Sequence, residues 1–67
     1  MNKKFLKNYQ KEIQEKIWRL EIDTKTLERE KLGKPTEIKQ IDYVLGKTKD
    51  SIEVWKRKLQ IIDELLK

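Results

Sequence analysis

The second half of the chain carries a long ladder of apolar residues, with one threonine, in which steps of three and four residues alternate. Its members are Ile38, Ile41, Leu45, Thr48, Ile52, Trp55, Leu59, Ile62 and Leu66. Such spacing places every member on one side of a long α-helix, and that side is suited to packing along another helix. The first half carries a shorter matching ladder: Leu6, Tyr9, Ile13, Ile17, Leu20, Thr24 and Leu27. The two ladders predict two long helices that pack against each other.

The segment between the ladders predicts a tight turn. Gly33 is placed to be a left-handed residue just after the first helix, and Pro35 cannot continue that helix. Pro35 or Thr36 can then open the second helix, because proline and threonine are favoured at helix starts. We therefore expect an all-α fold, an antiparallel helical hairpin that forms a single domain over residues 1–67. The expected elements are a helix over about residues 3–32, a turn at 33–35 and a helix over about 36–66.

Several large apolar residues lie outside both ladders. A chain of 67 residues without cysteine has a small core and no disulfides, so association is the remaining source of stability. A large apolar side chain left in water forgoes about 1.5–3 kcal/mol of burial. We expect these residues to pack against a second copy, giving a homodimer built as a four-helix bundle. The predicted self-association residues are Phe5, Trp18, Ile22, Val44, Val54, Ile61 and Leu65.

Gly46 lies in the middle of the second ladder and opens an alternative. Asp50 and Glu53 form a capping box that would start a new helix after a break at the glycine. The segment 36–58 resembles a bacterial helix-turn-helix, and that resemblance implies DNA binding. The residues that carry it are Ile41, Leu45, Gly46, Ser51, Ile52 and Trp55.

Two residues depart from the helix-turn-helix pattern. Asp42 stands where that motif usually has a small residue, and Lys47 stands where it usually has an apolar one. The ladder also keeps its phase across Gly46, which a turn would disturb. We therefore expect a continuous second helix, with the broken form as the alternative.

The composition points away from catalysis. The chain contains no histidine and no cysteine, so it has no imidazole base, no thiolate nucleophile and no histidine-based metal site. Its two isolated glycines cannot form a phosphate-binding loop. We expect a protein that is not an enzyme, with no cofactor, no metal and no small-molecule substrate.

The charge is unevenly distributed. The net charge is +5, and the first eleven residues contain four lysines and no acid. In a hairpin the second basic cluster, residues 56–58, would lie beside residues 9–11. Such a patch attracts an acidic protein surface or the phosphates of a nucleic acid. The predicted basic patch consists of Lys3, Lys4, Lys7, Lys11, Lys56, Arg57 and Lys58.

These observations predict a small interaction protein that self-associates and binds a macromolecular partner. No apolar run approaches the roughly 18 residues of a membrane span, and no secretory signal is recognisable, so we expect a cytoplasmic protein without a membrane partner. Many lysines and isoleucines without alanine indicate an AT-rich genome, which favours a regulator or inhibitor from a phage or mobile element. The alternative is nucleic-acid binding, by the segment 36–58 or by a basic hairpin dimer similar in architecture to small plasmid RNA-binding hairpins.

Overall fold

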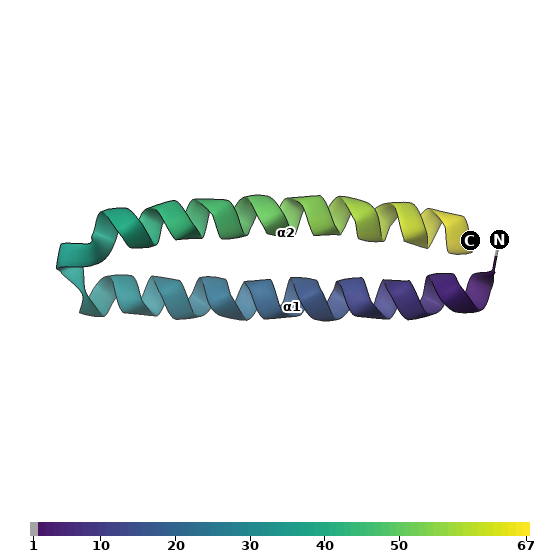
Figure 1. The fold of residues 1–67 in the computed structure, drawn as a ribbon, viewed down its shortest axis with the longest axis horizontal. Helices are drawn as coiled ribbons and strands as arrows, with labels where there is room; N and C mark the ends of the chain where they lie inside the picture. Colours follow the sequence, from purple (N-terminus) through teal and green to yellow (C-terminus); the bar gives the residue numbers. More distant parts are fainter. Residues whose placement is uncertain (1) are drawn as a thin grey trace.

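The computed structural model describes residues 2–67 and shows two antiparallel helices joined by a short turn (Figure 1). Helix α1 spans Lys3–Gly33, the 3-10 helix η1 spans Pro35–Glu37, and α2 spans Ile38–Leu66. The molecule is a rod with extents of 51 × 14 × 13 Å, and both termini lie at the end away from the turn. The expected fold of two long helices packed against each other is confirmed, and residues 2–67 contain no strand. The four-helix bundle stays a prediction.

The core of the rod consists of ladder residues. The six buried side chains of the described part of the chain all belong to the two ladders: Leu6, Ile13, Ile17, Ile41, Leu45 and Ile62. The other ladder residues are half-buried, except Ile38, which is 37% exposed beside the turn. The steps of three and four residues keep these side chains on one face of each helix, so the faces that the sequence predicted are the faces that meet.

The buried core cluster lies toward the open end of the hairpin. Leu6, Ile13, Ile17 and Ile62 form one buried cluster there. Four partly buried side chains pack around it: Tyr9, Trp55, Leu59 and Leu66. This cluster joins the first half of α1 to the last turns of α2, and it therefore ties together the two ends of the chain.

The turn differs from the expected one. Gly33 is the last residue of α1, and no residue among 2–67 has a positive φ, so the prediction of a left-handed glycine was wrong. The chain leaves the helix at Lys34 instead, with φ −133° and ψ 71°. Pro35 explains this, because a residue that precedes proline is disfavoured in the α-helical region. The Lys34 N–H donates to the Glu30 carbonyl at 2.9 Å, which closes the last turn of α1.

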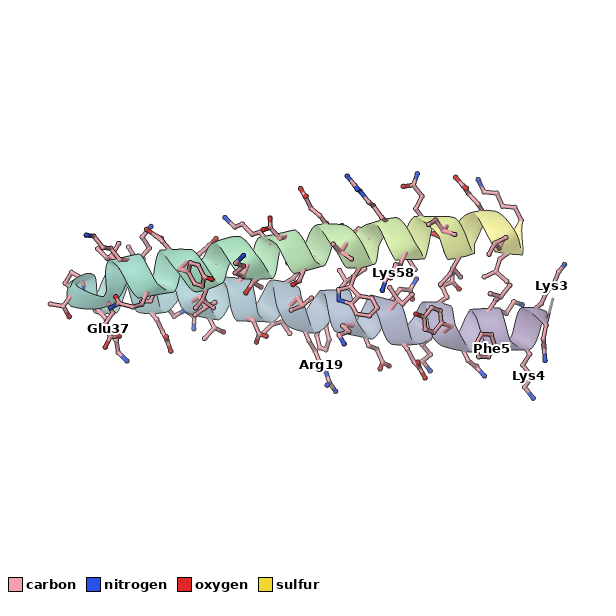
Figure 2. The ribbon with its side chains drawn as sticks, turned by 45° about the horizontal axis from the view of Figure 1, so that its top comes forward. Lys3, Lys4, Phe5, Arg19, Glu37 and Lys58 are labelled. Atoms are coloured by element: carbon pink, nitrogen blue, oxygen red, sulfur yellow. The ribbon has the colours of Figure 1, made fainter. Side chains whose placement is uncertain are left out.

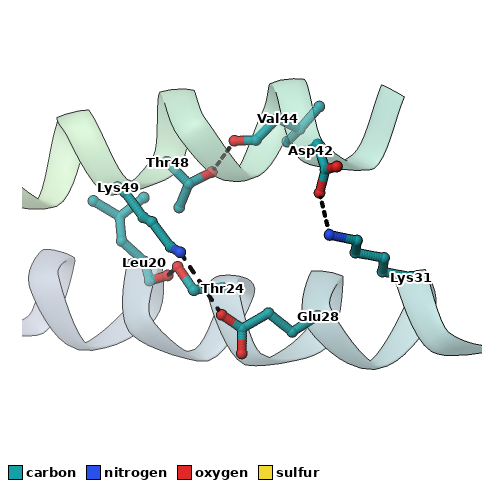
Figure 3. Close-up of polar contacts among 8 residues, drawn as sticks. All are labelled: Leu20, Thr24, Glu28, Lys31, Asp42, Val44, Thr48 and Lys49. Atoms are coloured by element: carbon teal, nitrogen blue, oxygen red, sulfur yellow. Dashed lines mark hydrogen bonds and ion pairs between the residues drawn. The ribbon is translucent and has the colours of Figure 1, made fainter. Parts of the chain in front are cut away.

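Helix α2 runs without interruption through Gly46. The expected continuous helix is therefore confirmed, and the alternative break before Asp50 is wrong. The Thr48 hydroxyl donates to the Val44 carbonyl at 2.8 Å, one helical turn earlier and on the other side of the glycine (Figure 3). Residues 36–58 consequently have no turn between two helices, and a helix-turn-helix is not formed. Ladder residues before and after Gly46 continue to face α1, which holds the helix straight where glycine alone would weaken it.

Polar contacts supplement the core toward the turn. Thr24 and Thr48 are ladder residues, and each donates its hydroxyl to a carbonyl one turn earlier, so its methyl group can lie in the interface (Figure 3). Lys31 pairs with Asp42 at 2.7 Å, and Glu28 approaches Lys49 at 4.0 Å. These ion pairs are exposed, so each contributes only about 0–1 kcal/mol.

Candidate interaction surfaces

Trp55 forms the most organised side-chain cluster on the surface. Its ring is half-buried beside the core, and two ammonium groups lie against it: Lys16 Nζ at 4.5 Å from the ring centroid and Lys58 Nζ at 4.4 Å. Lys16 comes from α1 and Lys58 from α2, so the ring connects the two helices. A cation over an aromatic face is stabilised by about 0.5–1 kcal/mol at an exposed site. The arrangement is structural, because both cations are already engaged with the ring.

The residues of the predicted basic patch point in different directions. Consecutive helical residues are rotated by about 100° from one another, so residues 56–58 point in three directions. Lys58 lies over Trp55, whereas Lys56 lines a shallow recess with Glu21 and Glu28. Figure 2 shows Lys58 directed toward α1, while Lys3 and Lys4 project from the far end of α1. Lys58 therefore lies apart from Lys3 and Lys4, and a common basic patch stays a prediction.

The predicted self-association residues are all exposed in the single hairpin. Their exposed fractions range from 42% for Ile22 to 65% for Trp18. They do not share one face, however. Trp18 and Ile22 lie on the side of α1 away from α2, and Val54 and Ile61 lie on the far side of α2. A single two-fold interface cannot cover both of these faces at once.

The other three self-association residues lie at the margins of the hairpin. Phe5 is 64% exposed and stacks on Tyr9, with the ring centroids 6.2 Å apart and the planes within 4° of parallel. Val44 and Leu65 are each about half exposed on α2. These side chains widen the apolar surface next to the core.

Two shallow depressions lie between the helices: one is lined by Tyr9, Lys16 and Trp55, and the other by Lys25, Ile52 and Lys56 among others. A further depression is lined by Glu12, Glu15, Lys16, Arg19 and Leu20, which all belong to α1. Within residues 2–67, no cluster of acidic side chains is arranged to hold a metal ion. Neither helix of that part of the chain has a stretch that is long and apolar enough to cross a membrane.

Sequence reasoning missed three features. Asn2 caps α1 by accepting a hydrogen bond from the Lys4 N–H at 2.9 Å, and its residue type could have indicated this. Lys16 was not linked to Trp55, because that contact depends on how the two helices are aligned. Lys25 and Arg29 lie on the same exposed line of α1 as the N-terminal lysines. Their spacing of seven and eleven residues from Trp18 could have indicated that they share one face of the helix with it.

Comparison with known proteins adds no relative: no family model, no curated protein and no solved structure matches the chain.

Proposed function

We propose that this chain is a non-enzymatic binding protein that self-associates and contacts an acidic macromolecular partner, in the role of a regulator or inhibitor. The observation that carries the proposal is the surface of the rod: among residues 2–67 six side chains are buried, while ten large apolar side chains are exposed among an excess of cations. Surfaces that combine large apolar side chains with charge are typical of protein interfaces. We further propose a cytoplasmic setting and a phage or mobile-element source, which the composition favours.

Self-association fits the dimensions of the hairpin. One long side of a rod of 51 × 14 Å projects onto roughly 700 Å², close to the area of about 800 Å² that each partner buries in a standard interface. The outer side of α2 is the best candidate for this contact. Val54 is 52% exposed and Ile61 is 58% exposed, and they are two turns apart on the same line of the helix.

Sedimentation equilibrium tests self-association. We expect a dimer at micromolar concentration, and we expect the double variant Val54→Ser/Ile61→Ser to dissociate at least about tenfold more readily. Leu32→Ser is the matched control. Leu32 is 87% exposed beside the turn, so this substitution removes a similar apolar side chain at a different place on the surface. A wild-type protein that stays monomeric throughout the concentration range would refute self-association.

Partner binding is tested separately by reversing the charges of Lys56, Arg57 and Lys58 to Glu. We expect this variant to stay helical and to lose the partner if α2 supplies the basic contacts. Binding should also weaken as salt rises, because charges are screened over about 8 Å at physiological ionic strength. Unchanged affinity in the folded variant would exclude the cluster 56–58 as the binding surface.

Nucleic-acid binding is the second candidate. It is favoured by the first turn of α1, which contains lysines and no acid, and by the exposed Lys7 and Lys11 that follow. A basic hairpin dimer would contact phosphates without a helix-turn-helix. Gel-shift experiments at two salt concentrations distinguish it, because phosphate contacts give an affinity that falls steeply with salt.

A further inference from the structure

The side of α1 that faces away from α2 carries a stripe of five cations, one glutamine and three apolar residues, and Glu15 and Arg19 border it. We call this set the outer stripe. Its members recur every three or four residues between the ladder positions, so they lie away from the ladder, and Lys25 also borders the recess that contains Ile52 and Lys56 of α2. The outer stripe consists of Lys4, Lys7, Lys11, Gln14, Trp18, Ile22, Lys25, Arg29 and Leu32.

All nine members of the outer stripe are exposed. The contrast with neighbouring ladder positions is sharp: Ile17 is 6% exposed, whereas Trp18 directly after it is 65% exposed. None of the five cations of the stripe is in an ion pair with any residue in the range 2–67. These charges are therefore available to a partner, unlike Lys16 and Lys58, which lie over the Trp55 ring.

The cations are arranged symmetrically about Trp18. Lys11 and Lys25 lie seven residues to either side of it, and Lys7 and Arg29 lie eleven residues to either side. Seven residues correspond to about 10.5 Å along the helix axis, and eleven to about 16.5 Å. The middle of the stripe is apolar, since Ile22 lies one turn after Trp18. Protein interfaces typically have an apolar core and a polar rim, and tryptophan is often one of the residues that contribute most to the binding energy.

A second copy of this chain is a poor occupant of the outer stripe. Two stripes crossing antiparallel at Trp18 would place Lys11 of one copy against Lys25 of the other, and Lys7 against Arg29. Like charges at such close range are repelled and suppress the pairing.

A nucleic-acid backbone also fits poorly. Lys11 and Lys25 are separated by about 21 Å along the axis, and the charges that border the stripe between them, Glu15 and Arg19, are opposite in sign. A polyanion is held best by a continuous track of cations, often with aromatic side chains for its bases. Here the gap holds Trp18 together with Ile22, and an isoleucine offers no stacking surface. The charges and the apolar pair instead complement a partner that is apolar at its centre and acidic at both ends.

We propose that the outer stripe binds one amphipathic helix of a partner protein, whose apolar residues cover Trp18 and Ile22 and whose carboxylates meet Lys11 and Lys25. This inference rests on the proposed function of binding an acidic macromolecule, and it names the surface and the partner. The partner helix would carry acidic residues seven and eleven positions before and after its apolar centre. These positions match the spacing of Lys7, Lys11, Lys25 and Arg29 around Trp18. Contact with carboxylates provides specificity and fast association, and burial of Trp18 provides much of the affinity.

The test uses the full chain and a synthetic helical peptide as the probe. The peptide has two leucines four residues apart at its centre and glutamates seven and eleven residues to each side, and it carries a fluorescent label at one end. A control peptide has glutamine in place of every glutamate. Fluorescence anisotropy at physiological salt gives the affinities. We expect the acidic peptide to bind and the glutamine peptide to bind at least about tenfold more weakly.

Two variants and one control identify the surface. We expect Trp18→Ala and the double variant Lys11→Glu/Lys25→Glu each to weaken binding of the acidic peptide by about tenfold or more. The control Lys39→Glu/Lys67→Glu changes the net charge equally at exposed sites off the stripe, so affinity should change by less than about twofold. Circular dichroism and sedimentation confirm that each variant keeps its helix content and its mass.

The other outcomes overturn the inference in distinct ways. If the variants at 56–58 lose the peptide while the outer-stripe variants keep it, the proposed function stands and the outer stripe is the wrong surface. If a thymidine oligonucleotide binds more tightly than the peptide and Trp18→Ala leaves that binding unchanged, the surface serves a nucleic acid. If Trp18→Ala alone converts a dimer to a monomer, the stripe is an interface between copies. If neither peptide binds the wild-type protein, an acidic helix is not its occupant.

Discussion

Replacement of Gly46 by alanine tests the continuity of α2 most directly. Gly46 lies in the helix interior, and a Cβ atom added there would meet no heavy atom within 4 Å. Its φ is not positive, so alanine can adopt the same backbone conformation. The substitution therefore adds no clash and no contact. Its effect comes from the unfolded state. Glycine has more backbone freedom there than alanine, so folding costs more conformational entropy when residue 46 is glycine.

The expected gain is about 1 kcal/mol, the difference between glycine and alanine in a helix interior. In a domain of this size that corresponds to a rise in Tm of about 4–8 °C. Thermal unfolding followed by far-ultraviolet circular dichroism measures it. Wild type and variant must be compared at equal protein concentration, because association makes Tm concentration-dependent. Gly33→Ala is the matched control: it also has open space around it, but it ends α1, so a smaller rise is expected.

Two results would contradict this reasoning. A lower Tm at every protein concentration would mean that Gly46 adopts a turn conformation that alanine cannot reach, as a helix-turn-helix requires. A lower Tm only at concentrations where the dimer forms would mean that a second hairpin approaches the helix closely at Gly46. In that case the open space around this residue in the single hairpin would be filled by the partner copy.

Three further substitutions test the packing and the helix ends. Ile13→Ala should cost about 2–5 kcal/mol in urea unfolding, because Ile13 is 1% exposed at the centre of the core cluster; a cost under about 1 kcal/mol would contradict that burial. Asn2→Ala should lower stability by about 0.5–2 kcal/mol through loss of the cap, while Asn2→Asp should preserve it. Lys31→Ala should change stability by at most about 1 kcal/mol and show little salt dependence, since its pair with Asp42 is exposed.

Much of the fold could be predicted from periodicity. The alternation of three and four residues identifies a helix face without reference to any neighbour, and the buried residues Leu6, Ile13 and Leu45 all lie on that face. The turn was harder to predict. Gly33 and Pro35 both end helices, but they do so by different backbone conformations, and the proline effect on Lys34 prevailed. The local sequence predicted a turn at residues 33–35, but it did not predict the backbone conformation of that turn.

The candidate surface was less predictable. Charge counting along the chain grouped the N-terminal lysines with residues 56–58, because they are close across the hairpin. Three consecutive residues on a helix nevertheless face three directions, and the Lys58 ammonium group lies over the Trp55 ring. The cations that do line up, from Lys4 to Arg29, are spread over most of α1. They form one surface only because the helix is continuous and its other side is covered by α2.

The sequence by itself determined the two helices, the position of the turn between them and the residues of the interface. Each of these depends on local spacing or on the backbone properties of proline, which act within a few residues. Tertiary structure decided which charges stay available. Packing α2 against α1 brings Lys16 and Lys58 onto one ring, pairs Lys31 with Asp42, and leaves the outer stripe exposed. Those outcomes depend on which residues of two distant segments lie side by side, and a pattern along one segment cannot specify that.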